Sequence, residues 1–176
     1  MRRSLVLGIV MVIVCHSVLL AQGPAARANL LIGSWKQNME KSTYSPGPPP
    51  RTWSVRQYAA GDDGAIVAIT MNVDLNGLPS LGAISAANYD EKEYVQHTVA
   101  TLASSLGSHI RPQVTRTISY KPVDPYSVEI VQKQDGRVVS MSTRTISRDG
   151  RTMTERFDYT NVEGQRVTNI LVFEKQ

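Results

Sequence analysis

The stretch from Arg137 to Lys175, RVVSMSTRTISRDGRTMTERFDYTNVEGQRVTNILVFEK, decides the fold. It contains three runs rich in Val, Ile, Thr and aromatic residues, separated by Asp149-Gly150 and by Glu163-Gly164-Gln165. Glycine tolerates the positive φ that tight hairpin turns need. The stretch therefore predicts three antiparallel strands that follow one another directly.

The same alternation of short strand and tight turn extends back to residue 32, with further turns at Gly61-Asp62-Asp63-Gly64, Asn76-Gly77 and Asp135-Gly136. A meander of this length tends to close on itself, because closure removes the exposed sheet edges. We predict one all-β domain over 29–176, an antiparallel meander closing into a β-barrel of about eight to nine strands. The expected strands are 32–38, 52–60, 65–73, 83–89, 113–121, 126–134, 137–147, 151–160 and 166–175.

One segment departs from the strand pattern. Val95, Val99, Leu102 and Leu106 recur at helical spacing, and Gly107 supplies a stop. We expect one short amphipathic helix near 95–106, packed as core against one end of the barrel.

The amino terminus has the order of a secretory signal. Met1-Arg2-Arg3 precedes an apolar stretch and then small residues. We expect a signal peptide over 1–21, with cleavage after Ala28 as the alternative, and a periplasmic or extracellular mature protein. The apolar run is shorter than the roughly 20 residues that span a bilayer, so no stable membrane span is expected after removal of the signal.

Composition excludes several classes of protein. The only cysteine, Cys15, lies in the signal, so the mature domain has no disulfide framework and no thiolate site. Removing Arg2 and Arg3 from the 19 basic residues lowers the formal charge from +4 to +2. The remaining basic residues are scattered singly, which does not favour nucleic-acid binding.

Alternation along 151–160 predicts which side chains face inward. Met153, Phe157 and Tyr159 share one face, and Glu155 lies on that face too. A carboxylate on an apolar wall either has a raised pKa and acts as an acid or base, or pairs with a cation; we favour pairing with Arg144 on the neighbouring strand. The expected cavity residues are Met141, Arg144, Met153, Glu155, Phe157 and Tyr159.

The proline-rich segment Ser45-Pro46-Gly47-Pro48-Pro49-Pro50 cannot join a sheet ladder. We expect an extended loop there. Tyr44, Pro46 and Pro48 are candidates for a lid over the mouth of the cavity, and ordinary loop packing is the alternative.

Sites of other chemistry lack support in the sequence. The mature histidines, His97 and His109, have no recognisable metal-ligand spacing. The sequence contains no nucleophile elbow, phosphate-binding glycine loop or dinucleotide fingerprint. We therefore expect no catalytic residues, no metal and no cofactor, and lean against an enzyme.

Gly33-Ser34-Trp35 resembles the Gly-x-Trp signature of lipocalin-like barrels. The resemblance continues over nearly the whole mature chain and points to secreted bacterial lipocalin-like domain proteins. It implies that Gly33 and Trp35 form a structural plug at one end of the barrel, with Arg166 or Lys175 packed over the tryptophan. The further stretches that carry it are Asn38, Lys41-Ser42, 44–48, Tyr89-Asp90 with Lys92, 144–154 and 173–175.

The chain departs from that family in three places. Glu91 stands where the usual turn has glycine, the stretch near 95–106 resembles an insertion, and the second lipocalin signature is missing. The resemblance implies a barrel with an internal cavity, and a ligand only by analogy of fold.

Two hypotheses of function follow. The leading one is a secreted binding protein that holds a small apolar or amphipathic ligand in a barrel cavity. The alternative is an envelope or extracellular protein-interaction module without a ligand, which predicts a packed barrel and an exposed apolar patch. The sequence leaves the identity of the ligand and the oligomeric state open.

Overall fold

The structure is a computed structural model that describes residues 30–98, 115–160 and 163–176. The predicted signal peptide lies outside the described residues. Ten strands are present in these ranges. They are β1 (Gly33–Ser45), β2 (Trp53–Ala60), β3 (Ile66–Val73), β4 (Pro79–Ala87), β5 (Tyr94–His97), β6 (Arg116–Pro122), β7 (Ser127–Gln134), β8 (Arg137–Ile146), β9 (Thr152–Thr160) and β10 (Arg166–Lys175).

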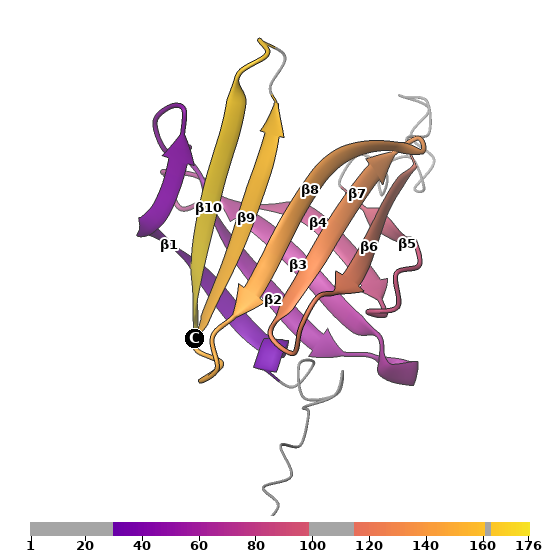
Figure 1. Cartoon of the computed structure of the whole chain (residues 1–176). Coiled ribbons are helices and arrows are strands. Elements are labelled where there is room, and N and C mark those ends of the chain that lie inside the picture. Colours follow the sequence, from indigo (N-terminus) through magenta and orange to yellow (C-terminus); the bar gives the residue numbers. More distant parts are fainter. Residues whose placement is uncertain (1–29, 99–114, 161–162) are drawn as a thin grey trace, which may run out of the picture.

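All ten strands form one closed antiparallel barrel (Figure 1). Each strand pairs with its neighbour in the sequence, and β1 pairs with both β2 and β10, which closes the sheet. The all-β class and the closed meander are thus confirmed. None of the helices within the described ranges has the length and apolar character needed to cross a bilayer.

The predicted strand number is wrong, because β5 lies inside the segment for which we predicted a helix. Tyr94–His97 pairs with β4 and β6, and Val95 faces outward with 55% of its surface exposed. Gln96, the next residue, is buried instead. Val95, the first residue of the apolar pattern that predicted a helix, therefore does not belong to the core. Thr98 is described and is not helical, and the remaining part of the predicted helix, 99–106, lies outside the described residues.

The barrel has a packed end, which we call the base. Leu31, Trp35, Met153 and Phe173 are its four largest fully buried side chains. Trp35 Nε1 donates a hydrogen bond to the carbonyl of Leu31 at 2.8 Å, so the segment before β1 is tied to the plug. The base lies at the end of the barrel where the chain terminus is marked in Figure 1.

Lys175 is the basic residue that covers the tryptophan. Its Nζ lies 5.2 Å from the centre of the Trp35 ring and donates to the carbonyl of Leu30 at 2.8 Å. Gly33 makes room for it: the backbone there has φ of +129°, and a Cβ would come within 2.9 Å of the Lys175 side chain. The positive φ therefore favours glycine at this position, and any larger residue would also displace the Lys175 side chain from the tryptophan.

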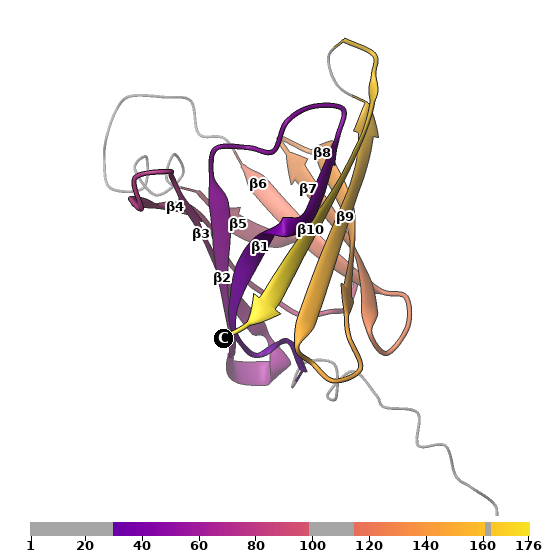
Figure 2. The ribbon, with the colours of Figure 1, turned by 90° about the vertical axis from the view of Figure 1, so that its left-hand side faces the viewer.

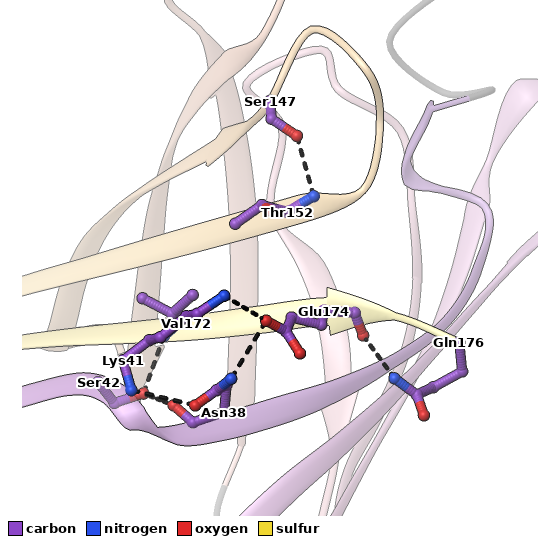
Figure 3. Close-up of polar contacts among 8 residues, drawn as sticks. All are labelled: Asn38, Lys41, Ser42, Ser147, Thr152, Val172, Glu174 and Gln176. Carbon is purple, nitrogen blue, oxygen red and sulfur yellow. Dashed lines mark hydrogen bonds and ion pairs between the residues drawn. The ribbon is translucent and has the colours of Figure 1, made fainter.

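A bulge in β1 shapes the opposite end, the mouth. The register between β1 and β10 shifts between Asn38 and Thr43. Side chains hold the bulge to β10: Asn38 Nδ2 donates to Glu174 Oε1 at 3.1 Å, and Ser42 Oγ accepts the Val172 N–H at 3.0 Å (Figure 3). Beyond the bulge, β1 continues along β10 to Ser45.

On its other side, β1 pairs with β2 only from Gly33 to Lys36. The two strands therefore separate toward the mouth. The loop between β1 and β2 and the long β9–β10 hairpin both rise at this end (Figure 2). This separation leaves space between β1 and β2 that the candidate site uses.

Candidate ligand cavity

The middle of the barrel contains a buried charge cluster of Arg56, Glu155 and Arg144, which we call the Arg–Glu–Arg cluster. Arg144 and Glu155 lie directly opposite each other on β8 and β9. Arg144 Nε and Nη2 donate to Glu155 Oε2 at 3.3 and 3.2 Å. Arg56 Nη1 reaches the same oxygen from β2, and Ser142 Oγ donates to Oε1 at 3.0 Å. The predicted pairing of Glu155 with Arg144 is confirmed.

The carboxylate of Glu155 is held in its charged form. Burial by itself raises the pKa of Glu155, but the two adjacent guanidinium groups outweigh it and lower that pKa to about 2. Burial lowers the pKa of both arginines, but it is outweighed: attraction to Glu155 raises the pKa of Arg56, and Tyr58 together with Glu155 raises that of Arg144. The cluster thus carries two positive charges and one negative charge.

Each arginine also has an N–H without a partner. Arg56 Nε and Arg144 Nη1 are buried, and neither forms a hydrogen bond within the described part of the chain. The two residues are 8% and 5% exposed. Because a buried, unsatisfied N–H is costly, these two groups lower the net stability that the cluster contributes.

Aromatic rings flank both guanidinium groups. Arg56 lies 4.3 Å from the centre of the Phe173 ring, and Arg144 lies 5.2 Å from that of Tyr58. Tyr120 is 5.9 Å from Arg144 and stacks on Tyr89 with ring centres 4.6 Å apart. Burial raises the pKa of the Tyr89 and Tyr120 hydroxyls, so both stay protonated. The rings restrict the arginines without neutralising them.

An inner cavity of about 160 Å³ adjoins the Arg–Glu–Arg cluster. Ala68 and Ala83 contribute small side chains to its wall, which leaves the space open. Gln132 Nε2 donates to Gln96 Oε1 at 3.2 Å on the polar side of the wall. The other lining residues are Arg56, Tyr58, Thr70, Ser85, Ile118, Tyr120, Ile130, Arg144, Glu155 and Phe157.

An outer pocket of about 300 Å³ lies toward the mouth, where β1 and β2 have separated. Gln37 spans this gap: its Oε1 accepts the Ser54 N–H at 2.9 Å, and its Nε2 donates to the Tyr44 hydroxyl at 2.7 Å. Phe157 lines both the inner cavity and the outer pocket. The other lining residues of the outer pocket are Gln37, Tyr44, Pro50, Thr52, Ser54, Tyr159, Asn169 and Leu171.

The predicted cavity residues fall into different places. Arg144, Glu155 and Phe157 line the inner cavity, and Tyr159 lines the outer pocket. Met153 faces inward, but it is fully buried in the packed base rather than at a cavity.

The prediction that Met141 lines the cavity is wrong. Its side chain is 56% exposed and lies on the outer surface of β8. The inward residues of that strand are Ser142, Arg144 and Ile146, which are all buried. Side chains alternate along a strand, so Met141 cannot share a face with Arg144. Its apolar character in a run of Ser and Thr had suggested otherwise.

Of the three residues predicted to form a lid, only Tyr44 lies at the outer pocket. Tyr44 lines the outer pocket as part of β1. Pro46 and Pro48 are exposed and do not line it, whereas Pro50 does. The chain turns outward after β1 and returns to the pocket only at the end of the proline-rich loop.

Sequence reasoning missed Arg56 and Tyr58. Both lie in β2, on the face shared with Ser54, while Gln57 between them is exposed. The alternation of Arg56 and Tyr58 with Val55 and Gln57 carried the signal. The inward orientation of Arg56 was not predicted, because an arginine is ordinarily assigned to the solvent-exposed face of a strand.

Among the described residues, no three His, Cys, Asp or Glu side chains come together as a metal site. His97 is exposed on β5, and His109 lies outside the described residues. The chain matches no family model, and no curated protein is significantly similar to it. The fold and the cavity therefore define the class of protein as a closed antiparallel β-barrel with a polar interior site.

Proposed function

We propose that this is an exported binding protein that holds a small amphipathic ligand inside its barrel. The observation that carries the proposal is the inner cavity beside the Arg–Glu–Arg cluster, with the outer pocket following it toward the mouth. Ligand sites are typically concave, mostly preformed and equipped with a few oriented polar groups. Export rests on the signal-like order of residues 1–21.

The position of the cavity and the pocket within the barrel also supports the proposal. The base is packed with apolar side chains, whereas the space lies between the middle and the mouth. Folding alone would favour apolar side chains in that space, because buried charges cost free energy that a well-packed apolar core does not. The alternative of an interaction module without a ligand predicts a packed barrel, which does not match a cavity of about 160 Å³.

The experiment fills the cavity without removing a polar group. Ala83 lines the inner cavity, and Ala86 is exposed on the same strand, so Ala83→Leu and Ala86→Leu form a matched pair. Each variant and the wild type would be purified without denaturation from the envelope fraction of the native host. Native mass spectrometry would then compare gentle with denaturing conditions.

We expect wild type and Ala86→Leu to carry an extra mass that is lost on denaturation, and Ala83→Leu to carry several-fold less of it. Absence of any extra mass from all three proteins would contradict the proposal. So would equal loading of Ala83→Leu and Ala86→Leu, since the ligand would then lie outside the inner cavity.

A further inference from the structure

We propose that the ligand carries an uncharged aromatic ring, which binds in the outer pocket beside Tyr44 and Phe157 and forms a hydrogen bond with the amide of Asn169. This inference rests on the proposed function and specifies the chemical class of ligand. Three observations carry it: a row of side chains across three strands, an accessible amide without a partner, and the neutral composition of the described residues that line the pocket.

The first observation is the row of side chains on the inner wall of the outer pocket. Tyr44 on β1 lies opposite Asn169 on β10, and Asn169 lies opposite Phe157 on β9. All three residues line the outer pocket and are partly exposed. Side chains directly opposite each other on neighbouring antiparallel strands have Cβ atoms roughly 5 Å apart. Asn169 is therefore flanked by two aromatic side chains at the wall of the pocket.

The second observation is that the Asn169 amide is open to a ligand. Its strand alternates so that Asn169 shares the inward face with Phe173, which is fully buried in the base. Among the described residues, the Asn169 side chain has no hydrogen-bond partner, and its amide atoms are not among the buried polar atoms that lack one. Unlike the enclosed N–H groups of Arg56 and Arg144, this amide is accessible. It offers both a donor and an acceptor to a hydroxyl group.

The third observation is the composition of the outer pocket. Tyr44, Phe157 and Tyr159 supply three aromatic rings, and every polar side chain among the described lining residues is neutral. A charged group entering the pocket would lose water without meeting an opposite charge, which is unfavourable. An aromatic ring gains apolar burial there and also the offset or edge-to-face contacts that rings prefer.

The order of the two compartments indicates how the ring is substituted. Phe157 lines both the outer pocket and the inner cavity, and Ala68 and Ala83 leave space in the inner cavity. A ring whose hydroxyl meets Asn169 can extend a substituent from its opposite side past Phe157. The inference therefore specifies a phenol with an apolar substituent opposite the hydroxyl.

The test uses three probes with the same apolar substituent: para-propylphenol, para-propylcyclohexanol and para-propylbenzoate. The exported protein, as its native host processes it, would be freed of copurified ligand by unfolding and refolding. Titration calorimetry at neutral pH would then measure the affinity of each probe. We expect the phenol to bind about threefold or more tightly than the cyclohexanol, which lacks an aromatic ring, and at least about tenfold more tightly than the benzoate, which is charged.

Two variants test the side chains of the row separately. Asn169→Leu removes the amide but keeps a side chain of similar size, so the affinity for para-propylphenol should fall about fivefold. Phe157→Leu removes one ring but keeps the wall apolar, so the preference for the phenol over the cyclohexanol should fall at least about twofold.

Thr168→Val is the matched control for Asn169→Leu. It also replaces a polar residue of β10 by an apolar one, but on the outer face, where the Thr168 hydroxyl donates to Asp158 Oδ1 at 2.7 Å. This variant should keep the wild-type affinity for para-propylphenol. If Asn169→Leu or Phe157→Leu fails to fold, the wild-type series alone decides.

The outcomes separate the inference from the proposed function. Cyclohexanol or benzoate binding as tightly as the phenol would overturn the inference while leaving a binding protein in place. Equal affinities of Asn169→Leu and Thr168→Val for para-propylphenol would overturn it in the same way. Failure of all three probes to bind overturns the inference, and the proposed function falls with it only if native mass spectrometry also finds no bound mass.

Discussion

The base and the middle of this barrel are built from the same strands but from opposite kinds of side chain. At the base, Trp35, Met153 and Phe173 are fully buried and apolar. Two residues farther along β9 from Met153, Glu155 is also buried but charged, and it is held by two arginines. A displacement of two residues along one strand thus changes the interior from packed hydrocarbon to an ion cluster beside a cavity.

This difference separates the region that stabilises the fold from the region of the proposed binding site. Apolar burial at the base stabilises the fold directly. A buried ion cluster contributes little net stability compared with well-packed apolar residues, although breaking it is costly. The base therefore contributes most of the apolar stabilisation, and the middle is where we propose that a ligand binds.

The largest expected effect is at the base. Replacing Trp35 by alanine should lower the free energy of unfolding by about 4 kcal/mol, because it removes a fully buried ring and the hydrogen bond to Leu31. Trp53→Ala is the matched control, since Trp53 is only partly buried and should cost about 1 kcal/mol. Urea unfolding followed by far-ultraviolet circular dichroism measures both. Equal losses would show that the base is not the stabilising region.

The contribution of the Arg–Glu–Arg cluster to the free energy of unfolding should depend on pH. The pKa of Glu155 is about 2 in the folded protein, against an ordinary value of 4.5. A lowered folded-state pKa contributes stability above the ordinary value, and that stability is lost as the pH falls toward the folded value. We expect about 3 kcal/mol to be lost between about pH 5 and pH 2, at 1.36 kcal/mol per pKa unit.

The variants identify the group responsible. Glu155→Gln should be less stable at neutral pH, because both guanidinium groups lose their partner, and its unfolding free energy should vary much less in that pH range. Asp158→Asn is the control: the Asp158 pKa is also lowered to about 2, chiefly by its hydrogen bond with Arg156, but this carboxylate is exposed and screened by solvent. An Asp158→Asn variant with a flattened pH profile would contradict the assignment to Glu155.

The sequence was sufficient for the class and connectivity of the fold, because hairpin turns and alternating strands are local signals. The tenth strand escaped because β5 is only Tyr94–His97, too short for alternation to outweigh an overlapping helical spacing. Strand pairing with β4 and β6, which no local pattern encodes, is what holds it in the sheet.

The candidate site was predictable only in part, for the same reason. Arg144 and Glu155 lie on consecutive strands, so a hairpin register brings them together. Arg56 is 99 residues from Glu155 and reaches it only through closure of the barrel. Alternation identifies which side chains face inward, but which inward groups meet across the barrel depends on its curvature.

The smallest expected effect is at Glu91, in the turn between β4 and β5 at the base end. Glu91 has φ of +66°, in the left-handed region that glycine adopts without steric cost. Its N–H donates to the carbonyl of Tyr120 at 3.1 Å, so the turn is fixed beside the stacked Tyr89–Tyr120 pair and cannot relax freely. Glu91→Gly should therefore raise the free energy of unfolding by up to about 1 kcal/mol, and Glu91→Ala, which keeps the Cβ, should not. Equal urea midpoints for the two variants would mean that side-chain interactions of Glu91, rather than its backbone conformation, set the stability of this turn.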